Sequence, residues 1–197
     1  LLGWSTENEI FSIDELIELF KLENVQKAAA VFDLKRFNWV SSQQLAKLDE
    51  NGFFEVIKPF MKDEDVSEDY PNYKKILIAM RTSKTNLKDI AHATRPFFFE
   101  LDGYDEKGVK KFLNESLETL TFALEVLSKL TEWNETELDM ALIKVRDYFN
   151  LPIPKVNQPM RIALVGSTVS PSLGLTLELF GKEKSLERIQ KAIDFIS

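Results

Sequence analysis

Apolar side chains recur at intervals of three and four residues along almost the whole chain, and this pattern restricts the fold more than any other feature. It is clearest over 105–130, where leucines, phenylalanines and a valine follow the period of an α-helix. Runs that alternate in the manner of a β-strand are few and short. The sequence therefore predicts an all-α fold of two helical-bundle subdomains, in which each helix buries one apolar face.

Residues that cap helices mark where several of these helices begin. Ser12 and Asn134 are each followed three positions later by a glutamate, which is the spacing of a capping box. Asp33 and Asn86 are further candidates, because such side chains accept hydrogen bonds from the first backbone N–H groups of a helix. The predicted helices are 12–20, 33–45, 49–61, 73–80, 86–95, 105–130, 134–150, one that ends at Gly181 and a last one capped by Ser185.

The composition excludes several kinds of site. The chain has no cysteine and one histidine, His92, so a structural zinc site, a disulfide framework and a Cys–His nucleophile pair are ruled out. The acidic run 63–69 lacks the glycine and the closing glutamate of a calcium-binding EF-hand loop, and we expect a solvated linker there. No metal site is expected. No apolar run approaches the roughly 20 residues of a membrane span and the amino end has no basic leader, so we expect a cytoplasmic protein without a membrane partner.

The distribution of charge matters more than its sum. A net charge of −7 argues against a nucleic-acid partner, because phosphates are ordinarily neutralised by lysine and arginine. However, 73–95 holds six basic side chains against one acid, and 155–197 holds six against four. These two regions are expected to converge on one positive face that binds RNA rather than DNA, although each alone is also compatible with a solvated helix face.

Turn signals divide the stretch from position 160 onward. An apolar run over 160–165 stops at Gly166. Ser170 and Pro171 then have the residue types of an N-cap and of the first position of a helix, and Gly181 ends that helix. We therefore expect a helical hairpin whose second helix begins at Ser170.

The residues that open this helix are candidate RNA contacts. The amino end of a helix has unpaired N–H groups and positive potential, so 168–173 offers donors to phosphates or base edges. Arg161, alone in the apolar run, adds a planar fork that pairs with a base or stacks on it. From the pattern alone, an ordinary cap and an arginine paired with a glutamate remain the alternative.

The order of these signals resembles the carboxy-terminal anticodon-binding domain of bacterial glutamyl-tRNA synthetases. That family has a proline, an arginine-led apolar run, a glycine, a Ser/Thr-Pro pair and a Gly-Lys-Glu turn. The corresponding residues here are Pro159, Arg161 to Leu164, Gly166, Ser170-Pro171-Ser172-Leu173 and Gly181-Lys182-Glu183. The resemblance implies that Arg161, Ser170, Pro171 and Leu173 contact the anticodon of the tRNA for glutamate.

The resemblance extends to the first part of the chain. The matching residues there are Phe32, Asp33, Lys35 and Trp39. It implies a stem-contact helical subdomain over 1–69 and an anticodon-binding helical subdomain over 70–197. We expect Trp39 to lie in the core rather than to serve as a platform for a base, because large aromatic side chains are mostly buried.

The loop after position 80 is the second region expected to contact the anticodon. In the family, an arginine in this helix-loop helps to recognise the third anticodon letter. Its place is taken here by Ser83 or, with a shift of one residue, by Lys84. A hydroxyl tolerates either letter and a lysine offers an unspecific charge, so we expect relaxed discrimination between glutamate and glutamine tRNAs. The alternative that Lys84 or Arg81 reaches the same base remains open.

For the whole enzyme, the resemblance implies ligation of glutamate to tRNA with ATP and magnesium. The chain lacks the family's His-Ile-Gly-His-like and Lys-Met-Ser-Lys-Ser-like motifs. We therefore expect no catalytic residue and no cofactor in this chain, which is expected to bind and orient tRNA as a monomer. The rival hypothesis is a helical protein-interaction module without RNA binding, which the net charge of −7 favours.

Overall fold

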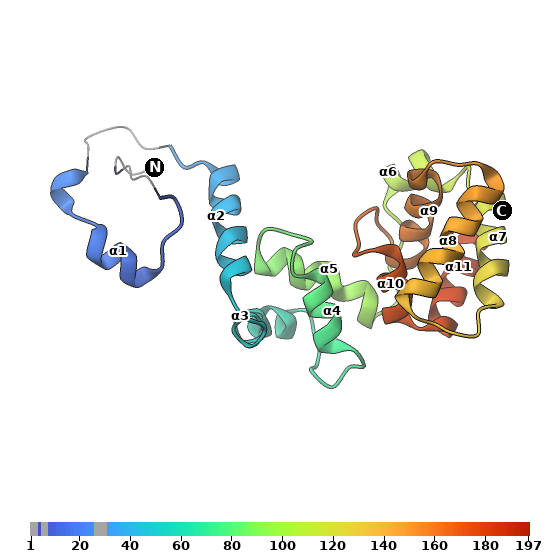
Figure 1. Cartoon of the computed structure of the whole chain (residues 1–197), viewed down its shortest axis with the longest axis horizontal. Helices are drawn as coiled ribbons and strands as arrows, with labels where there is room; N and C mark the ends of the chain where they lie inside the picture. The colour runs from blue at the N-terminus through green and yellow to red at the C-terminus, as the bar shows by residue number, and fades with distance from the viewer. Residues whose placement is uncertain (1–3, 5–7, 26–30) are drawn as a thin grey trace.

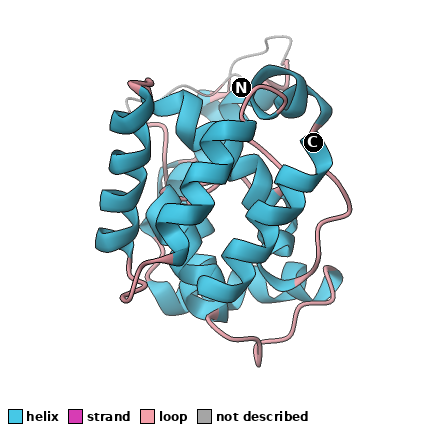
Figure 2. Ribbon diagram, turned by 90° about the vertical axis from the view of Figure 1, so that its right-hand side faces the viewer, coloured by secondary structure: helices cyan, strands magenta, loops and turns pink. Residues whose placement is uncertain are grey.

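A computed structural model of the chain describes residues 4, 8–25 and 31–197. Every regular element among these residues is a helix (Figure 1), which confirms the predicted all-α fold. Figure 2, turned to face the carboxy-terminal end, shows these helices joined by loops. The elements are α1 (Ile13–Leu19), the 3₁₀ turn η1 (Leu22–Asn24), α2 (Leu34–Lys47), α3 (Glu50–Asp63), α4 (Tyr73–Met80), α5 (Leu87–Phe98), α6 (Glu106–Gly108), the π-helical turn η2 (Val109–Leu113), α7 (Leu117–Ser128), α8 (Glu135–Phe149), α9 (Ile153–Val165), α10 (Leu173–Phe180) and α11 (Lys182–Ile196).

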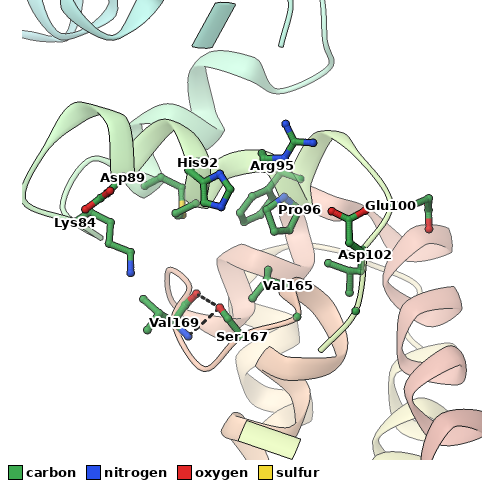
Figure 3. A pocket seen from close by; sticks show the side chains of 16 residues that line it. Lys84, Asp89, His92, Arg95, Pro96, Glu100, Asp102, Val165, Ser167 and Val169 are labelled. Carbon is green, nitrogen blue, oxygen red and sulfur yellow. Dashed lines mark hydrogen bonds between the residues drawn. The ribbon is translucent and has the colours of Figure 1, made fainter. Parts of the chain in front are cut away.

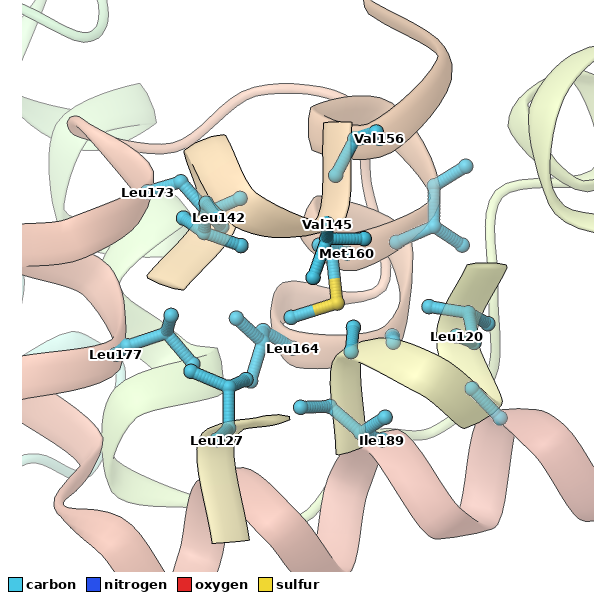
Figure 4. Packing of buried hydrophobic residues seen from close by; sticks show 14 of the residues in the cluster. Leu120, Leu127, Leu142, Val145, Val156, Met160, Leu164, Leu173, Leu177 and Ile189 are labelled. Atoms are coloured by element: carbon cyan, nitrogen blue, oxygen red, sulfur yellow. The ribbon is translucent and has the colours of Figure 1, made fainter. Parts of the chain in front are cut away.

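The helices bury their apolar faces in two cores. The amino-terminal core gathers buried side chains of α2 to α5, including Phe53, Ile57 and Leu77. The carboxy-terminal core is formed by η2 and α7 to α11, and Figure 4 shows Met160 of α9 near its centre beside Leu164. In Figure 1 the first helices lie at one end of an elongated molecule and the carboxy-terminal bundle lies at the other.

One helix, α10, contributes to both cores. Leu173 and Leu177 are buried in the carboxy-terminal core, whereas Leu179 is buried in the amino-terminal core and Leu175 packs against it. Residues four positions apart share a helix face, and the two pairs are offset by about half a turn. The leucines at every second position are therefore explained by a helix that lies between the two cores and is apolar on both of the sides that face them.

Four of the capping residues predicted from the sequence are confirmed, namely Ser12, Asp33, Asn86 and Asn134. Ser12 and Glu15 form a reciprocal capping box, with the Ser12 hydroxyl 3.2 Å from the Glu15 nitrogen. The side chains of Asp33, Asn86 and Asn134 each accept a backbone N–H bond from the first turn of the helix that follows. These bonds satisfy donors that would otherwise be unpaired, so local sequence is enough to fix where these helices begin.

The prediction of one long helix over 105–130 is wrong. The helical segment 106–113 ends in the π turn, and α7 begins again at Leu117. The Ser116 hydroxyl donates to the Leu113 carbonyl oxygen at 2.6 Å. Such a local side-chain bond offers the backbone a partner outside the helical ladder, which accounts for the interruption.

Two predicted helix starts are displaced. The N-cap of α10 is Ser172 rather than Ser170, because the first helical bond runs from the Thr176 N–H to the Ser172 carbonyl oxygen. Likewise, α11 begins directly after Gly181, and Ser185 lies buried inside that helix rather than at its cap. The residue types identified Gly181 as the end of α10, but not as the start of α11.

The expectation of a buried Trp39 is also wrong. Its side chain is 42% exposed, and the Arg36 guanidinium lies 5.7 Å from the ring centroid. The acidic run 63–69 is likewise more than a solvated linker, because Glu64 accepts hydrogen bonds from Arg95 and approaches His92 at 3.2 Å. These bonds tie the end of α3 to α5.

The amino-terminal core spans the predicted boundary after residue 69. It includes side chains of α3, which precedes that position, and of α4 and α5, which follow it. The functional division into 1–69 and 70–197 stays a prediction. Within the described residues, no helix combines the length and apolar character needed to cross a membrane.

Candidate nucleic-acid interface

A groove of about 440 Å³ separates α5 from the segment that follows α9 (Figure 3). Helix α5 contributes His92 and Pro96 to one wall, and the loop before it contributes Lys84. The opposite wall contains Ser167 and Val169, which belong to the loop between α9 and α10. The groove therefore lies between the two stretches that the sequence singled out as RNA contacts.

At the base of the groove, the backbone at Gly166 lies close to the backbone of residues 103–105. Gly166 has φ of +72°, and a side chain added there would meet the carbonyl oxygen of Gly103 at 2.8 Å. The Asp105 N–H donates to the Gly166 carbonyl oxygen at 2.8 Å. Only glycine fits this left-handed, crowded position, so Gly166 fixes the exit of the chain from α9 into the loop.

Arg161 organises the loop between α9 and α10, here defined as 166–172. Its Nη1 donates to the carbonyl oxygens of Ser170 and Pro171, at 2.8 Å and 2.5 Å, and to the Ser170 hydroxyl. The guanidinium is half-buried, and this burial lowers the pKa of Arg161. The structure therefore brings Arg161, Ser170 and Pro171 together, and the arginine holds the loop instead of pairing with a glutamate.

Leu173 differs from the other residues predicted on this loop. Its side chain is 3% exposed and is packed in the carboxy-terminal core. Close by, the Thr176 hydroxyl donates to the Ser170 hydroxyl at 3.2 Å, which ties the first turn of α10 to the loop. The side chain of Leu173 is therefore part of the core and does not line the groove.

The three residues predicted in the loop after α4 have different surroundings. Lys84 is exposed and lines the groove. The Ser83 hydroxyl donates to the Met80 carbonyl oxygen at 2.6 Å. Arg81 donates to the carbonyl oxygens of Leu45 and Leu48, which hold its guanidinium at the end of α2. Of the three, Lys84 is the side chain that faces the groove.

Further polar residues in the groove were not singled out from the sequence. Asp89 and His92 lie three residues apart on α5, and Glu100 and Asp102 follow that helix. Together with Lys84 and Arg95 they give a lining of nearly balanced charge. The helical spacing of positions 89, 92 and 96 was the available signal, because it places them on one face of α5. A lining of this kind suits the edges and faces of bases better than phosphates.

Arg188 supports the groove from beneath and was also missed. It is 2% exposed, and its guanidinium donates to the carbonyl oxygens of Leu164 and Phe99, the second at 2.6 Å. The guanidinium also lies 4.5 Å from the centroid of Phe180, and burial lowers the pKa of Arg188 to about 10. One side chain of α11 thus joins the ends of α5 and α9, from which both walls continue.

The described residues contain no group of three or more histidine, aspartate or glutamate side chains arranged to hold a metal ion. The groove instead combines two facing loops, a cation and several hydrogen-bonding groups on a rigid helical scaffold. Hydrogen-bonding groups held in place are what the recognition of unstacked bases requires.

The sequence matches the family described as "Anticodon binding domain" over residues 52–193, and the chain belongs to this family. The match begins inside α3 and includes both walls of the groove.

Full-length relatives extend the comparison. The chain is 34% identical, over its whole length, to glutamate–tRNA ligase 2 of Thermoanaerobacter pseudethanolicus, of which it covers 42%. It is 32% identical, over 98% of its length, to the glutamate–tRNA ligase of Thermodesulfovibrio yellowstonii, of which it covers 43%. The chain therefore spans less than half the length of these relatives.

Solved structures agree with the sequence comparisons. A crystal structure of a glutamate tRNA ligase from Elizabethkingia meningosepticum superposes on the whole chain with a TM-score of 0.81 at 28% identity, the match covering 40% of that protein. The glutamate–tRNA synthetase of Elizabethkingia anophelis gives a TM-score of 0.77, also at 28% identity, over 98% of this chain and 39% of that protein. These findings confirm the resemblance to glutamyl-tRNA synthetases and do not favour a protein-interaction module.

Proposed function

We propose that this chain is the tRNA-binding part of a glutamate–tRNA ligase and that its groove holds the anticodon. The proposal rests on one observation above all. The loop after α4 and the loop 166–172, which the sequence singled out separately, form opposite walls of one groove inside a domain of the anticodon-binding family.

The walls of the groove suit different tasks. Lys84 offers a charge at one wall, and the loop held by Arg161 offers backbone and hydroxyl groups at the other. Specificity for a base requires donors and acceptors that are held in place. A flexible surface must be ordered when it binds, and this ordering costs binding free energy. We infer that Arg161 acts mainly by holding Ser170 and Pro171 in the geometry that recognises the anticodon.

The chemistry of the whole enzyme is also a proposal. A glutamate–tRNA ligase joins glutamate to tRNA at the expense of ATP, with magnesium. We assign no step of that reaction to this chain. We propose that it acts in the cytoplasm as a monomer, that 1–69 contacts the tRNA stem, that 70–197 contacts the anticodon, and that the tRNA for glutamine is also bound.

A competition titration tests the proposal. Labelled transcript of the tRNA for glutamate is titrated with the chain, and unlabelled transcripts with each anticodon letter replaced in turn serve as competitors. We expect the replaced transcripts to compete more weakly by about 1 to 3 kcal/mol at the letters that the groove recognises. Equal competition by every transcript would show that the groove does not hold the anticodon.

The division of roles is tested by comparing two RNAs. Amide hydrogen exchange is measured with the full tRNA and with its isolated anticodon stem-loop. We expect both RNAs to protect α5 and the loop 166–172, and only the full tRNA to protect residues before position 69. Protection of the first part by the stem-loop alone would contradict the predicted division.

A further inference from the structure

The helical segment 106–113, formed by α6 and η2, carries an unpaired positive face. Lys107, Lys110 and Lys111 stand three and four positions apart, which places them on one side of the segment. All three are exposed, and none forms an ion pair with a carboxylate in the part of the chain that the structure describes. Four other lysines of the bundle, Lys129, Lys155, Lys184 and Lys191, are paired with glutamates, whereas Lys182 donates to the Leu130 carbonyl oxygen. Lys144 of α8 is exposed like the three on this segment. The Lys111 ammonium lies 5.1 Å from the centroid of the Phe112 ring. We call Lys107, Lys110 and Lys111 the lysine face.

Packing fixes the lysine face beside the groove. A side chain added at Gly108 would lie 3.0 Å from Ile162 Cδ1 and 3.3 Å from Thr168 Cγ2, so this segment touches both α9 and the loop 166–172. Figure 1 shows α6 next to α9 at the same end of the bundle. Because the opposite side of the segment is packed, the lysines extend away from the bundle at the edge of the loop.

The backbone of this segment is unusual. The Asn114 N–H donates to the Val109 carbonyl oxygen at 3.1 Å, which is the bond pattern of a π-helix. Lys110 and Lys111 lie within this turn, and the buried Leu113 anchors its other side. Single π turns are rare and frequently occur at functional sites.

The groove itself provides little to neutralise phosphates. Asp89, Glu100 and Asp102 offset Lys84 and Arg95 in its lining. The chain as a whole carries a net charge of −7. Affinity for RNA nevertheless depends strongly on phosphate neutralisation, so a chain that binds RNA needs cations outside a groove of this kind.

We propose that Lys107, Lys110 and Lys111 bind the phosphate backbone of the RNA whose anticodon occupies the groove. The inference rests on the proposed function and deepens it. The lysine face contributes affinity that is independent of base sequence, while the groove contributes the preference for particular anticodon letters.

The dependence of binding on salt tests the inference. The triple variant Lys107→Gln, Lys110→Gln, Lys111→Gln and the unchanged chain are titrated with an anticodon stem-loop of the glutamate tRNA between 50 and 200 mM salt. Each phosphate contact to a single strand contributes about 0.7 to the slope of log affinity against log salt, so we expect the slope to fall by about 2. The unchanged chain then loses about twentyfold more affinity over this range than the variant does. The ratio of affinities for the cognate and an anticodon-substituted stem-loop is expected to stay the same.

A second triple variant controls for net charge. Lys21→Gln, Lys62→Gln and Lys144→Gln remove three exposed lysines from other elements and are expected to leave the slope unchanged. An equal fall in both variants, or no fall in the first, overturns the inference. If the unchanged chain shows no preference for the cognate anticodon, the proposed function is overturned and this inference with it. An intact preference combined with an unchanged slope overturns this inference alone.

Discussion

Two arginines stabilise the groove from different depths. Arg161 is half-buried and bonds within the wall itself, to Ser170 and Pro171. Arg188 is buried and bonds beneath the walls, to the carbonyl oxygens of Leu164 and Phe99. We therefore expect replacement of the first to act mainly on RNA binding and replacement of the second to act mainly on stability.

Replacing Arg161 by alanine is expected to weaken binding of the cognate anticodon stem-loop by about 1 to 3 kcal/mol. The Ser170 and Pro171 carbonyl oxygens lose their shared donor, and the loop 166–172 loses its fixed geometry. Isothermal titration gives the affinity, and circular dichroism shows whether the chain remains folded. Arg146→Ala, which removes an arginine paired with the exposed Asp147 on α8, is the control. Unchanged affinity in the Arg161 variant would assign the arginine a purely structural role.

Replacing Arg188 by methionine is expected to lower the free energy of unfolding by about 2 to 5 kcal/mol. The buried Leu164 carbonyl oxygen and the partly buried Phe99 carbonyl oxygen lose a charged donor, and an orphaned buried group costs about 1 to 3 kcal/mol. Urea denaturation followed by circular dichroism measures the change. Lys191→Met on the same helix, half-exposed and paired with glutamates, is expected to change stability by less than about 1 kcal/mol. A similar small change for both variants would show that Arg188 is dispensable.

At the scale of the elements, the sequence predicts those features whose hydrogen-bond partners lie close by in the chain. The N-caps at Ser12, Asp33 and Asn86 bond to backbone groups two or three positions away, so the residue types alone identify them. The partners of Arg188 lie 24 and 89 positions away, and no periodic pattern indicates them. The displaced start of α10 has the same cause, because the Ser172 hydroxyl donates to Glu135 of another helix instead of capping its own.

Helices α8 and α10 pack so closely that one glycine is required between them. A side chain at Gly174 would lie 2.5 Å from Asp139 Oδ1 and 2.8 Å from the Glu135 carbonyl oxygen. Gly174→Ala is therefore expected to lower the free energy of unfolding by about 1 to 3 kcal/mol through overpacking, although alanine favours a helix by about 1 kcal/mol. Thermal or urea unfolding measures the change. Gly103→Ala, where nothing lies within 4 Å of the added carbon, is expected to be nearly neutral.

At the scale of the whole molecule, the groove depends on how the two cores meet. One wall belongs to α5 of the amino-terminal core, and the other continues from α9 of the carboxy-terminal core. The sequence predicted that both stretches converge on one face but not that they form opposite walls of a groove, because that depends on packing through α10. It also favoured Ser83 over Lys84 as the residue at the family's arginine position, whereas Lys84 is the one that lines the groove.

The positions of Lys84 and Arg81 predict weak discrimination at the third anticodon letter. Lys84 provides one charge without a fixed fork, and the Arg81 guanidinium is held on carbonyl oxygens of α2, so neither is set to distinguish pyrimidine from purine. We expect two transcripts that differ only in that letter to bind with affinities within about tenfold, or about 1.4 kcal/mol. Competition titration measures the ratio. Lys84→Arg, which restores a fork at the groove, is expected to increase the preference, and a much larger preference in the unchanged chain would contradict the prediction.

The way the two cores are joined also governs how the molecule melts. Phe97 packs against both cores, and its ring stacks on Phe180 with centroids 4.7 Å apart. When one aromatic pair and one shared helix couple two cores, loss of either core removes contacts from the other, so we expect unfolding of one core to lower the stability of the other. A ligand that spans the groove strengthens this coupling, because it binds only while both cores are folded. RNA binding in this chain is therefore linked to the cooperativity of its folding.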